Sequence, residues 1–205
     1  MNAYKFRTTD DLDRVADILV NRRLYCSDVE HLNDIREADI RVGNDRGREG
    51  KLLEFGLSVT RAIRAYRVCS LSKTFNNPLL WAHYAGGSSG LVIEVPLPAP
   101  DSIDVVYDDD FIFLSDYLDA GVDAAVRAAL ARKTKAWQHE EEVRVIVRAQ
   151  FCDLPAPIPR VIVGSRMGRT TLHAVAQLCS THGIAIERAV VADWGVYTVG
   201  LQQVG

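Results

Sequence analysis

Three stretches of the chain place charged or hydroxyl side chains two residues apart, the spacing that puts them on one face of a β-strand. These residues are Lys5 and Arg7 in AYKFR, Ser70 and Ser72 in VCSLS, and Glu140, Glu142 and Arg144 in EEEVRV. A carboxylate can stabilise a developing positive charge or act as a base, and a guanidinium binds phosphate oxygens through its fork of N–H groups. The three stretches therefore offer groups that could act together on one polar substrate.

Glutamates are concentrated where the third of these strands is predicted to begin, in the stretch AWQHEEEVRVIV. Like charges side by side disfavour a strand unless something opposes them. If Val143 and Val145 face the core, the opposite face carries Glu140, Glu142 and Arg144. Two interpretations stay open: a solvent-exposed, salt-bridged strand face, or a site in which Arg144 is the counter-ion that lowers the glutamate pKa values and keeps these groups ionised.

Two aromatic residues, Trp81 and Tyr84, lie three positions apart in the predicted helix LLWAHYA, and therefore on one face. Aromatic residues at this spacing usually pack in a core, and contact with a ligand is the alternative. His83 falls off that face, so we expect it at the surface or at a cap. Asn33, in the stretch HLND, is expected to form a turn.

The elements that must position these residues follow from periodicity and from Gly and Pro breakers. Strands are predicted over residues 3–7, 24–29, 68–72, 91–95, 102–107, 140–147, 160–164 and 186–192. Helices are predicted over residues 12–22, 50–65, 79–85, 116–136 and 171–182. Several neighbouring strands are joined too briefly for parallel crossovers, so the order predicts an α+β fold with largely antiparallel sheets. We expect residues 1–205 to form a single domain.

Composition narrows the class of protein. With 48% hydrophobic and 25% charged residues, the chain has the balance of a globular protein. It has no apolar run of membrane-spanning length and no secretory signal, so a cytoplasmic location without membrane contact is expected. The four cysteines form no C-x-x-C pair, and we expect buried thiols rather than a disulfide framework or zinc site. The net charge of −3 disfavours tight nonspecific binding of nucleic acid.

The order of several motifs resembles the bacterial domain-of-unknown-function family 2971. The chain carries YKFR near its start, LND at 32–34, CSLSKTFNNPLLWAHYAGGSSGLVIE, WQHEEEVRVI, and IVG at 162–164. Members of that family typically show YKYR, FNDP, a C-S-L-S strand followed by W-x-x-Y, and W-x-x-E-x-E-x-R in this order. The resemblance extends from about residue 4 to residue 164. Membership of this family would not indicate which reaction, if any, the protein catalyses.

A second, looser resemblance suggests a reaction. The chain has a basic strand residue, an S-x-S strand, a helix with aromatic residues, a Gly-led apolar strand and E-x-E entering a strand, in that order. This order is similar to the R-S-E arrangement of ADP-ribosyltransferases. The resemblance implies an ADP-ribosyltransferase-like α+β fold, with split antiparallel β-sheets, flanking helices, and NAD bound as a substrate in the cleft between the sheets.

The resemblance also implies roles for the two carboxylates. Cleavage of the bond between nicotinamide and ribose passes through an oxocarbenium-like ribose, which a nearby carboxylate stabilises. Glu142 is expected in that role. Glu140 is expected to orient the acceptor nucleophile or to act as its base.

The binding residues follow from the same resemblance. Arg7 is expected to bind a phosphate or ribose oxygen of NAD. Ser70 is expected to hydrogen-bond the ribose or the nicotinamide side, and Ser72 to support Glu142. Tyr84 would stack on nicotinamide, with Trp81 beside it on the same helix face.

The leading hypothesis is an NAD-consuming mono-ADP-ribosyltransferase-like protein, in the setting of a bacterial toxin or phage-defence effector that could have an antitoxin partner. Its acceptor could be a protein, a nucleic acid or a small molecule, and water as acceptor would make it an NAD glycohydrolase. The alternative is a non-catalytic nucleotide- or partner-binding sensing module that keeps the cleft. Metal-assisted hydrolysis by His139, Glu140 and Glu142 is the weakest alternative, because His139 falls on the opposite strand face, and no metal is expected.

Overall fold

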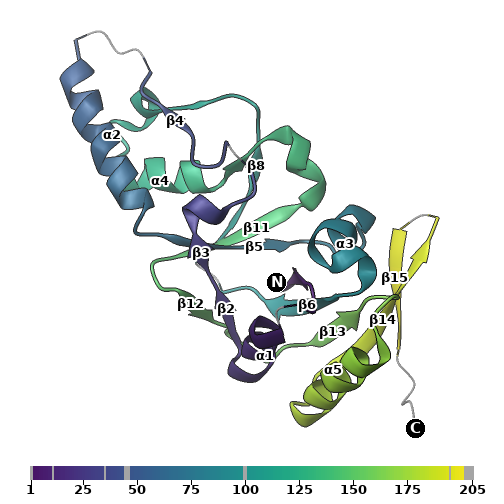
Figure 1. Ribbon diagram of the computed structural model, residues 1–205. Coiled ribbons are helices and arrows are strands. Elements are labelled where there is room, and N and C mark those ends of the chain that lie inside the picture. Colours follow the sequence, from purple (N-terminus) through teal and green to yellow (C-terminus); the bar gives the residue numbers. More distant parts are fainter. Residues whose placement is uncertain are drawn as a thin grey trace.

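The computed structural model describes residues 2–10, 12–34, 36–43, 47–98, 101–193 and 195–200. Within these ranges the main sheet has nine strands in the order β15-β14-β13-β6-β1-β5-β11-β7, with β3 paired to β5 (Figure 1). Its strands are β1 (Asn2–Arg7), β3 (Ser27–Asp28), β5 (Arg67–Ser72), β6 (Leu91–Pro96), β7 (Ser102–Asp104), β11 (Glu142–Val147), β13 (Arg160–Val163), β14 (Ala185–Ala192) and β15 (Gly195–Gly200). Among these strands only β13 and β14 pair in parallel, so the sheet is largely antiparallel, as predicted.

Three short sheets lie around the main one. An antiparallel pair joins β2 (Arg23–Tyr25) to β12 (Phe151–Asp153). Parallel pairs join β4 (Ile40–Arg41) to β9 (Ile112–Phe113), and β8 (Val106–Tyr107) to β10 (Arg132–Lys133). The architecture is therefore a mixed α+β fold with several sheets.

Helices cover both faces of the main sheet. The α-helices are α1 (Leu12–Asn21), α2 (Glu49–Ile63), α3 (Pro78–Tyr84), α4 (Val122–Leu130) and α5 (Arg169–Thr181). Short 3-10 helices are η1 (Val29–His31), η2 (Gly86–Ser88), η3 (Leu114–Tyr117) and η4 (Lys135–Glu140). None of the helices in the described ranges is long and apolar enough to cross a bilayer.

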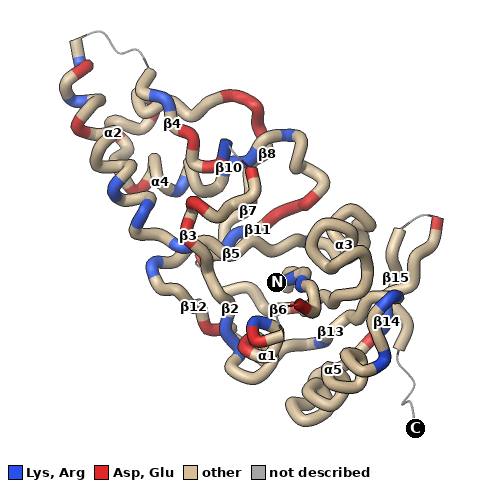
Figure 2. The backbone as a smooth tube through the Cα atoms, viewed as in Figure 1, with Lys and Arg blue, Asp and Glu red and all other residues tan. Residues whose placement is uncertain are grey.

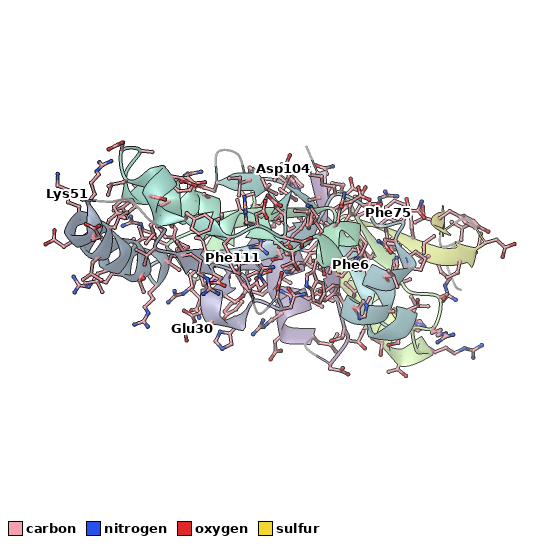
Figure 3. The ribbon with its side chains drawn as sticks, turned by 90° about the horizontal axis from the view of Figure 1, so that it is seen from above. Phe6, Glu30, Lys51, Phe75, Asp104 and Phe111 are labelled. Carbon is pink, nitrogen blue, oxygen red and sulfur yellow. The ribbon has the colours of Figure 1, made fainter. Side chains whose placement is uncertain are left out.

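Three hydrophobic clusters show which helix covers which part of the sheet. Helices α1 and α5 pack on one face, where Ala3, Leu71 and Val145 are buried among their side chains. On the other face, α3 packs over β1, β6 and β13, whereas α2 and α4 pack over β5 and β11. The molecule is elongated in Figure 3, and Lys51 of α2 lies at one end while Phe75 lies toward the other.

The main sheet is divided between β1 and β5. Strand β1 pairs with β6 along six residues, and β5 pairs with β11 along six residues. In contrast, β1 pairs with β5 only where Tyr4 lies opposite Ser72. The two halves of the sheet therefore meet at one residue pair and separate beyond it.

Most predicted elements are present with small changes of boundary. The predicted strand at 24–29 is interrupted at Cys26, and the one at 102–107 is divided into β7 and β8. The predicted helix over 116–136 is wrong, because α4 ends at Leu130 and the following residues form β10 and η4. Pairing of β10 with β8 satisfies backbone groups that a longer helix would have satisfied internally. Strands β4, β9, β12 and β15 were not predicted.

Candidate functional site

A cleft of about 380 Å³ opens where the two halves of the sheet separate. Six of the seven residues predicted to form a site line this cleft, namely Arg7, Ser70, Ser72, Tyr84, Glu140 and Glu142. The seventh, Trp81, is instead buried in the core between α3 and the sheet, against Phe6. Its indole N–H donates to the backbone carbonyl of Phe75 at 2.7 Å, so we assign it a packing role.

Glu142 begins β11 and is buried with an exposed fraction of 3%. Its Oε1 accepts from Nε of Arg144 at 2.7 Å, and its Oε2 accepts from Nζ of Lys133 at 3.0 Å. Burial alone would raise the pKa of Glu142. The pKa is instead lowered to about 2 by the charge and hydrogen bonds of Arg144, by the charge of Lys133 and by a hydrogen bond from Ser70. Glu142 is therefore a fixed carboxylate, and Arg144 is the counter-ion that the sequence predicted.

Glu140 lines the cleft from a 3-10 helix and not from the strand that was predicted to carry it. It ends helix η4, and Glu141 then adopts a left-handed conformation before the strand starts at Glu142. The predicted strand alternation therefore holds for Glu142 and Arg144 but is wrong for Glu140 and Glu141. Figure 2 shows the acidic stretch that leads into β11. Glu140 Oε1 accepts from the Tyr84 hydroxyl at 2.5 Å, so its carboxylate still joins the cleft wall.

The two serines make hydrogen bonds within the protein that were not predicted. Ser72, not Ser70, was expected to support Glu142. In the structure the Ser72 hydroxyl donates to the backbone carbonyl of Glu140 at 2.8 Å and accepts from the amide of Thr74 at 3.1 Å. Ser70 is the half-buried serine that hydrogen-bonds the Glu142 carboxylate. Ser72 thus holds the loop that carries Glu140, and Ser70 connects Glu142 to the cleft.

Lys133 links the two glutamates, and sequence analysis missed it. Its Nζ donates to Oε2 of Glu140 at 2.5 Å, to Oε2 of Glu142 at 3.0 Å and to Oδ1 of Asn33 at 2.9 Å. It is 3% exposed and lies 4.8 Å from the centre of the Trp137 ring. Burial alone would lower the pKa of Lys133, but the adjacent carboxylates raise it above the ordinary value. Lys133 was assigned to a predicted helix, which hid it from the analysis of strand faces.

Glu37 completes the buried charge cluster behind the cleft. Its Oε1 accepts from Nη2 of Arg144 at 2.6 Å, whereas its Oε2 is buried and has no hydrogen-bond partner among the described residues. Burial raises the pKa of Glu37 despite the nearby positive charges of Arg144 and Lys133. The described cluster therefore contains three carboxyl groups and two cations, and Glu37 holds a proton more readily than Glu142 does.

The basic residues of β1 lie on the other face of the sheet. Because Tyr4 is directly opposite Ser72, these two share a face, and Lys5 and Arg7 project from the opposite one. Both nonetheless line the cleft, which passes between the separated strands. Lys5 extends its Nζ across the gap to the backbone carbonyl of Ser70 at 2.7 Å. Burial lowers the pKa of Lys5.

Tyr84 and Asn33 form the rim near the carboxylates. Tyr84 is half-buried and lines the cleft, as predicted for a ligand-contacting residue. Burial and the hydrogen bond to Glu140 raise its pKa above the ordinary value. Asn33, predicted to form only a turn, donates its amide to the Tyr84 hydroxyl and accepts from Lys133. His83, predicted away from this helix face, also lines the cleft.

The cleft consequently has two chemically different ends. Carboxylates, a phenol and a serine hydroxyl lie on the α3 face of the sheet, while the side chains of Lys5, Arg7 and Arg14 come from the α1 face. Such a cleft can hold a ligand that becomes cationic at one end and carries anionic groups further along. Among the described residues, no three His, Cys, Asp or Glu side chains are grouped so that they could hold a metal ion.

Comparisons of this chain with models of protein families, with curated proteins and with solved structures gave no match. The family resemblance of the motifs therefore remains an expectation. A functional assignment rests on the geometry of the cleft.

Proposed function

We propose that the protein consumes NAD as a mono-ADP-ribosyltransferase, cleaving the bond between nicotinamide and ribose and transferring ADP-ribose to an acceptor. The observation that carries the proposal is the cleft between the separated strands β1 and β5, which is lined by Arg7, Ser70 and Glu142. Its charge distribution supports the orientation of NAD, with the nicotinamide ribose near the carboxylates and the diphosphate near Lys5 and Arg7.

Glu142 acts in this proposal as a fixed negative charge. Its low pKa keeps it ionised at neutral pH, as stabilisation of an oxocarbenium-like ribose requires. Ser70 donates to Glu142, and its oxygen remains able to accept from a ribose hydroxyl. Ser70 thereby holds the ribose while Glu142 stabilises the charge that develops as nicotinamide departs with the bonding electron pair.

Glu140 and Tyr84 supply the base. The acceptor hydroxyl attacks the ribose carbon as it transfers its proton to the Tyr84 oxygen, while the Tyr84 proton moves along the 2.5 Å hydrogen bond to Glu140. Lys133 holds the Glu140 carboxylate in place by donating to its Oε2. Products are the ADP-ribosylated acceptor, nicotinamide and one proton. A protein, a nucleic acid or a small molecule could serve as the acceptor, and water would give ADP-ribose.

One observation favours the alternative of a non-catalytic binding module. The Glu142 side chain is only 2% exposed, and both of its oxygens already accept hydrogen bonds from Arg144 or Lys133. A binding module would use the cationic end of the cleft for a nucleotide and the carboxylate cluster only for stability. The two functions differ in whether nicotinamide is released.

The test measures nicotinamide release from NAD with purified protein, with and without cell lysate as a source of acceptor. Glu142→Gln and Ser70→Ala are the informative variants, and Glu37→Gln is the matched control because Glu37 contacts the same arginine but does not line the cleft. We expect the first two variants to lower the rate at least about 100-fold and about tenfold, respectively, and Glu37→Gln to retain it. NAD binding without nicotinamide release in the wild type would favour the binding module.

A further inference from the structure

A guanidinium and an aromatic ring are stacked on the cationic side of the cleft. The Arg14 guanidinium of α1 lies 4.3 Å from the centre of the Tyr25 ring of β2, and both side chains line the cleft. The Tyr25 ring is fixed from the side by Phe151, whose ring centre is 5.7 Å away in an edge-on arrangement. Tyr25 and Phe151 are cross-strand partners in the sheet of β2 and β12. We call Arg14 and Tyr25 the ring platform.

The Phe151 ring that contacts the ring platform is itself held in place by Arg23. Arg23 stacks 4.0 Å from the centre of the Phe151 ring, and its Nε donates to Asp17 of α1 at 2.9 Å. Helix α1 and strand β2 therefore hold the platform through alternating rings and guanidinium groups. Such a preorganised surface loses little side-chain entropy when a planar ligand stacks on it.

The location of the platform relates it to the carboxylates. Helix α1 and β2 pack on one face of the main sheet through Val15 and Leu24, whereas Tyr84 belongs to the cluster on the opposite face. The cleft is lined from both faces, and Lys5 and Arg7 of β1 line it from the same face as the ring platform. A ligand that fills it would therefore contact carboxylates on one side, and cations together with the ring platform on the other.

We propose that the ring platform binds the adenine ring of NAD, and equally that of adenosine monophosphate or ADP-ribose. Bases stack on aromatic rings and on guanidinium planes, and nearby cations complement the phosphates attached to the nucleoside. NAD likewise carries its nicotinamide ribose at one end, and its diphosphate and adenine toward the other. This inference rests on the proposed function for the nicotinamide end of the ligand, but the adenine site can be tested separately.

The experiment measures the dissociation constants of three ligands by titration calorimetry: NAD, adenosine monophosphate, and nicotinamide mononucleotide, which lacks the adenylate. Tyr25→Leu should weaken NAD and adenosine monophosphate at least about tenfold, while nicotinamide mononucleotide changes less than twofold. Tyr25→Phe keeps the ring and should bind like the wild type. The matched control is Tyr66→Leu, which removes a ring stacked with Arg148 at 5.1 Å outside the cleft.

The outcomes separate the two proposals. If Tyr25→Leu binds NAD as tightly as the wild type, the ring platform is not the adenine site, and the proposed function is unaffected. If the wild type binds adenosine monophosphate and NAD through Tyr25 but releases no nicotinamide from NAD, the platform is confirmed and the proposed function fails. If none of the three ligands binds, both are overturned. Should Tyr25→Leu unfold, Arg14→Gln on the exposed side of the platform gives the same readout.

Discussion

Removal of Lys133 should strongly destabilise the protein, because this one ammonium group holds two glutamates together inside it. Lys133→Met keeps most of the apolar side-chain volume but leaves Glu37, Glu140 and Glu142 with Arg144 as their nearest described counter-ion. Breaking a buried ion pair by removal of one partner costs about 3–5 kcal/mol, since the remaining charge is buried without compensation. We expect a loss of that size in the free energy of unfolding.

Urea unfolding at pH 7, followed by circular dichroism, measures this loss. The matched control is Lys135→Met, two residues along the chain, whose side chain is 56% exposed and lies 3.5 Å from Asp108. An exposed pair of this kind contributes about 0–1 kcal/mol, so the control should unfold nearly as the wild type does. Adding Glu140→Gln to Lys133→Met should restore about 1 kcal/mol or more, because it removes one of the uncompensated charges.

The reasoning about Lys133 is refuted if Lys133→Met lowers the free energy of unfolding by less than about 1 kcal/mol, or by no more than Lys135→Met does. It is also refuted if Glu140→Gln makes Lys133→Met less stable. Either result would mean that the carboxylates of the cluster are neutral or hydrated in the folded protein.

Three further predictions concern the cluster and the neighbouring core. The pKa of Glu142 is about 2 in the folded protein and near 4.5 when unfolded. Its ionised form therefore contributes about 3 kcal/mol to the free energy of unfolding above pH 4.5, and this contribution is lost as the pH falls toward 2. Urea titrations at pH 7, 4.5 and 2.5 should show the loss in the wild type but not in Glu142→Gln. Glu37→Gln should lower the free energy of unfolding at pH 7 by less than Glu142→Gln does, because burial raises the pKa of Glu37 whereas Arg144 and Lys133 lower that of Glu142, and a loss as large as that of Glu142→Gln would contradict this reasoning. Trp81→Leu should lower the free energy of unfolding by about 3 kcal/mol in the same assay without weakening NAD binding. Reduced NAD affinity in the folded variant would contradict the packing role and mean that Trp81 contacts the ligand.

The strand faces could be predicted because side chains alternate strictly within a strand. Ser70 and Leu71 lie on opposite faces as predicted, and the burial of Leu71 fixes the register. Arg144 was recognised as a counter-ion from its position two residues after Glu142. These inferences needed only local sequence, since both residues of each pair belong to one strand.

The rest of the site depends on contacts between distant parts of the chain. Glu37 meets Arg144 across 107 positions, and Lys133 meets Asn33 across 100. No periodicity in a single segment indicates such contacts. Lys133 was further concealed because the sequence around it favours a helix, and only the pairing of β10 with β8 ends that helix early. The separation of β1 from β5 depends on pairing between distant strands and could not be predicted from the periodicity of either strand.

The central claim is that the cleft between β1 and β5 cleaves NAD with the help of Glu142. Nicotinamide release from NAD by the wild-type protein tests it most directly, with Glu37→Gln and Glu142→Gln assayed beside it under conditions in which both are folded. The account predicts release by the wild type and Glu37→Gln, and at least a 100-fold lower rate for Glu142→Gln. Equal release by all three proteins, or no release by the wild type with any acceptor source, would contradict it.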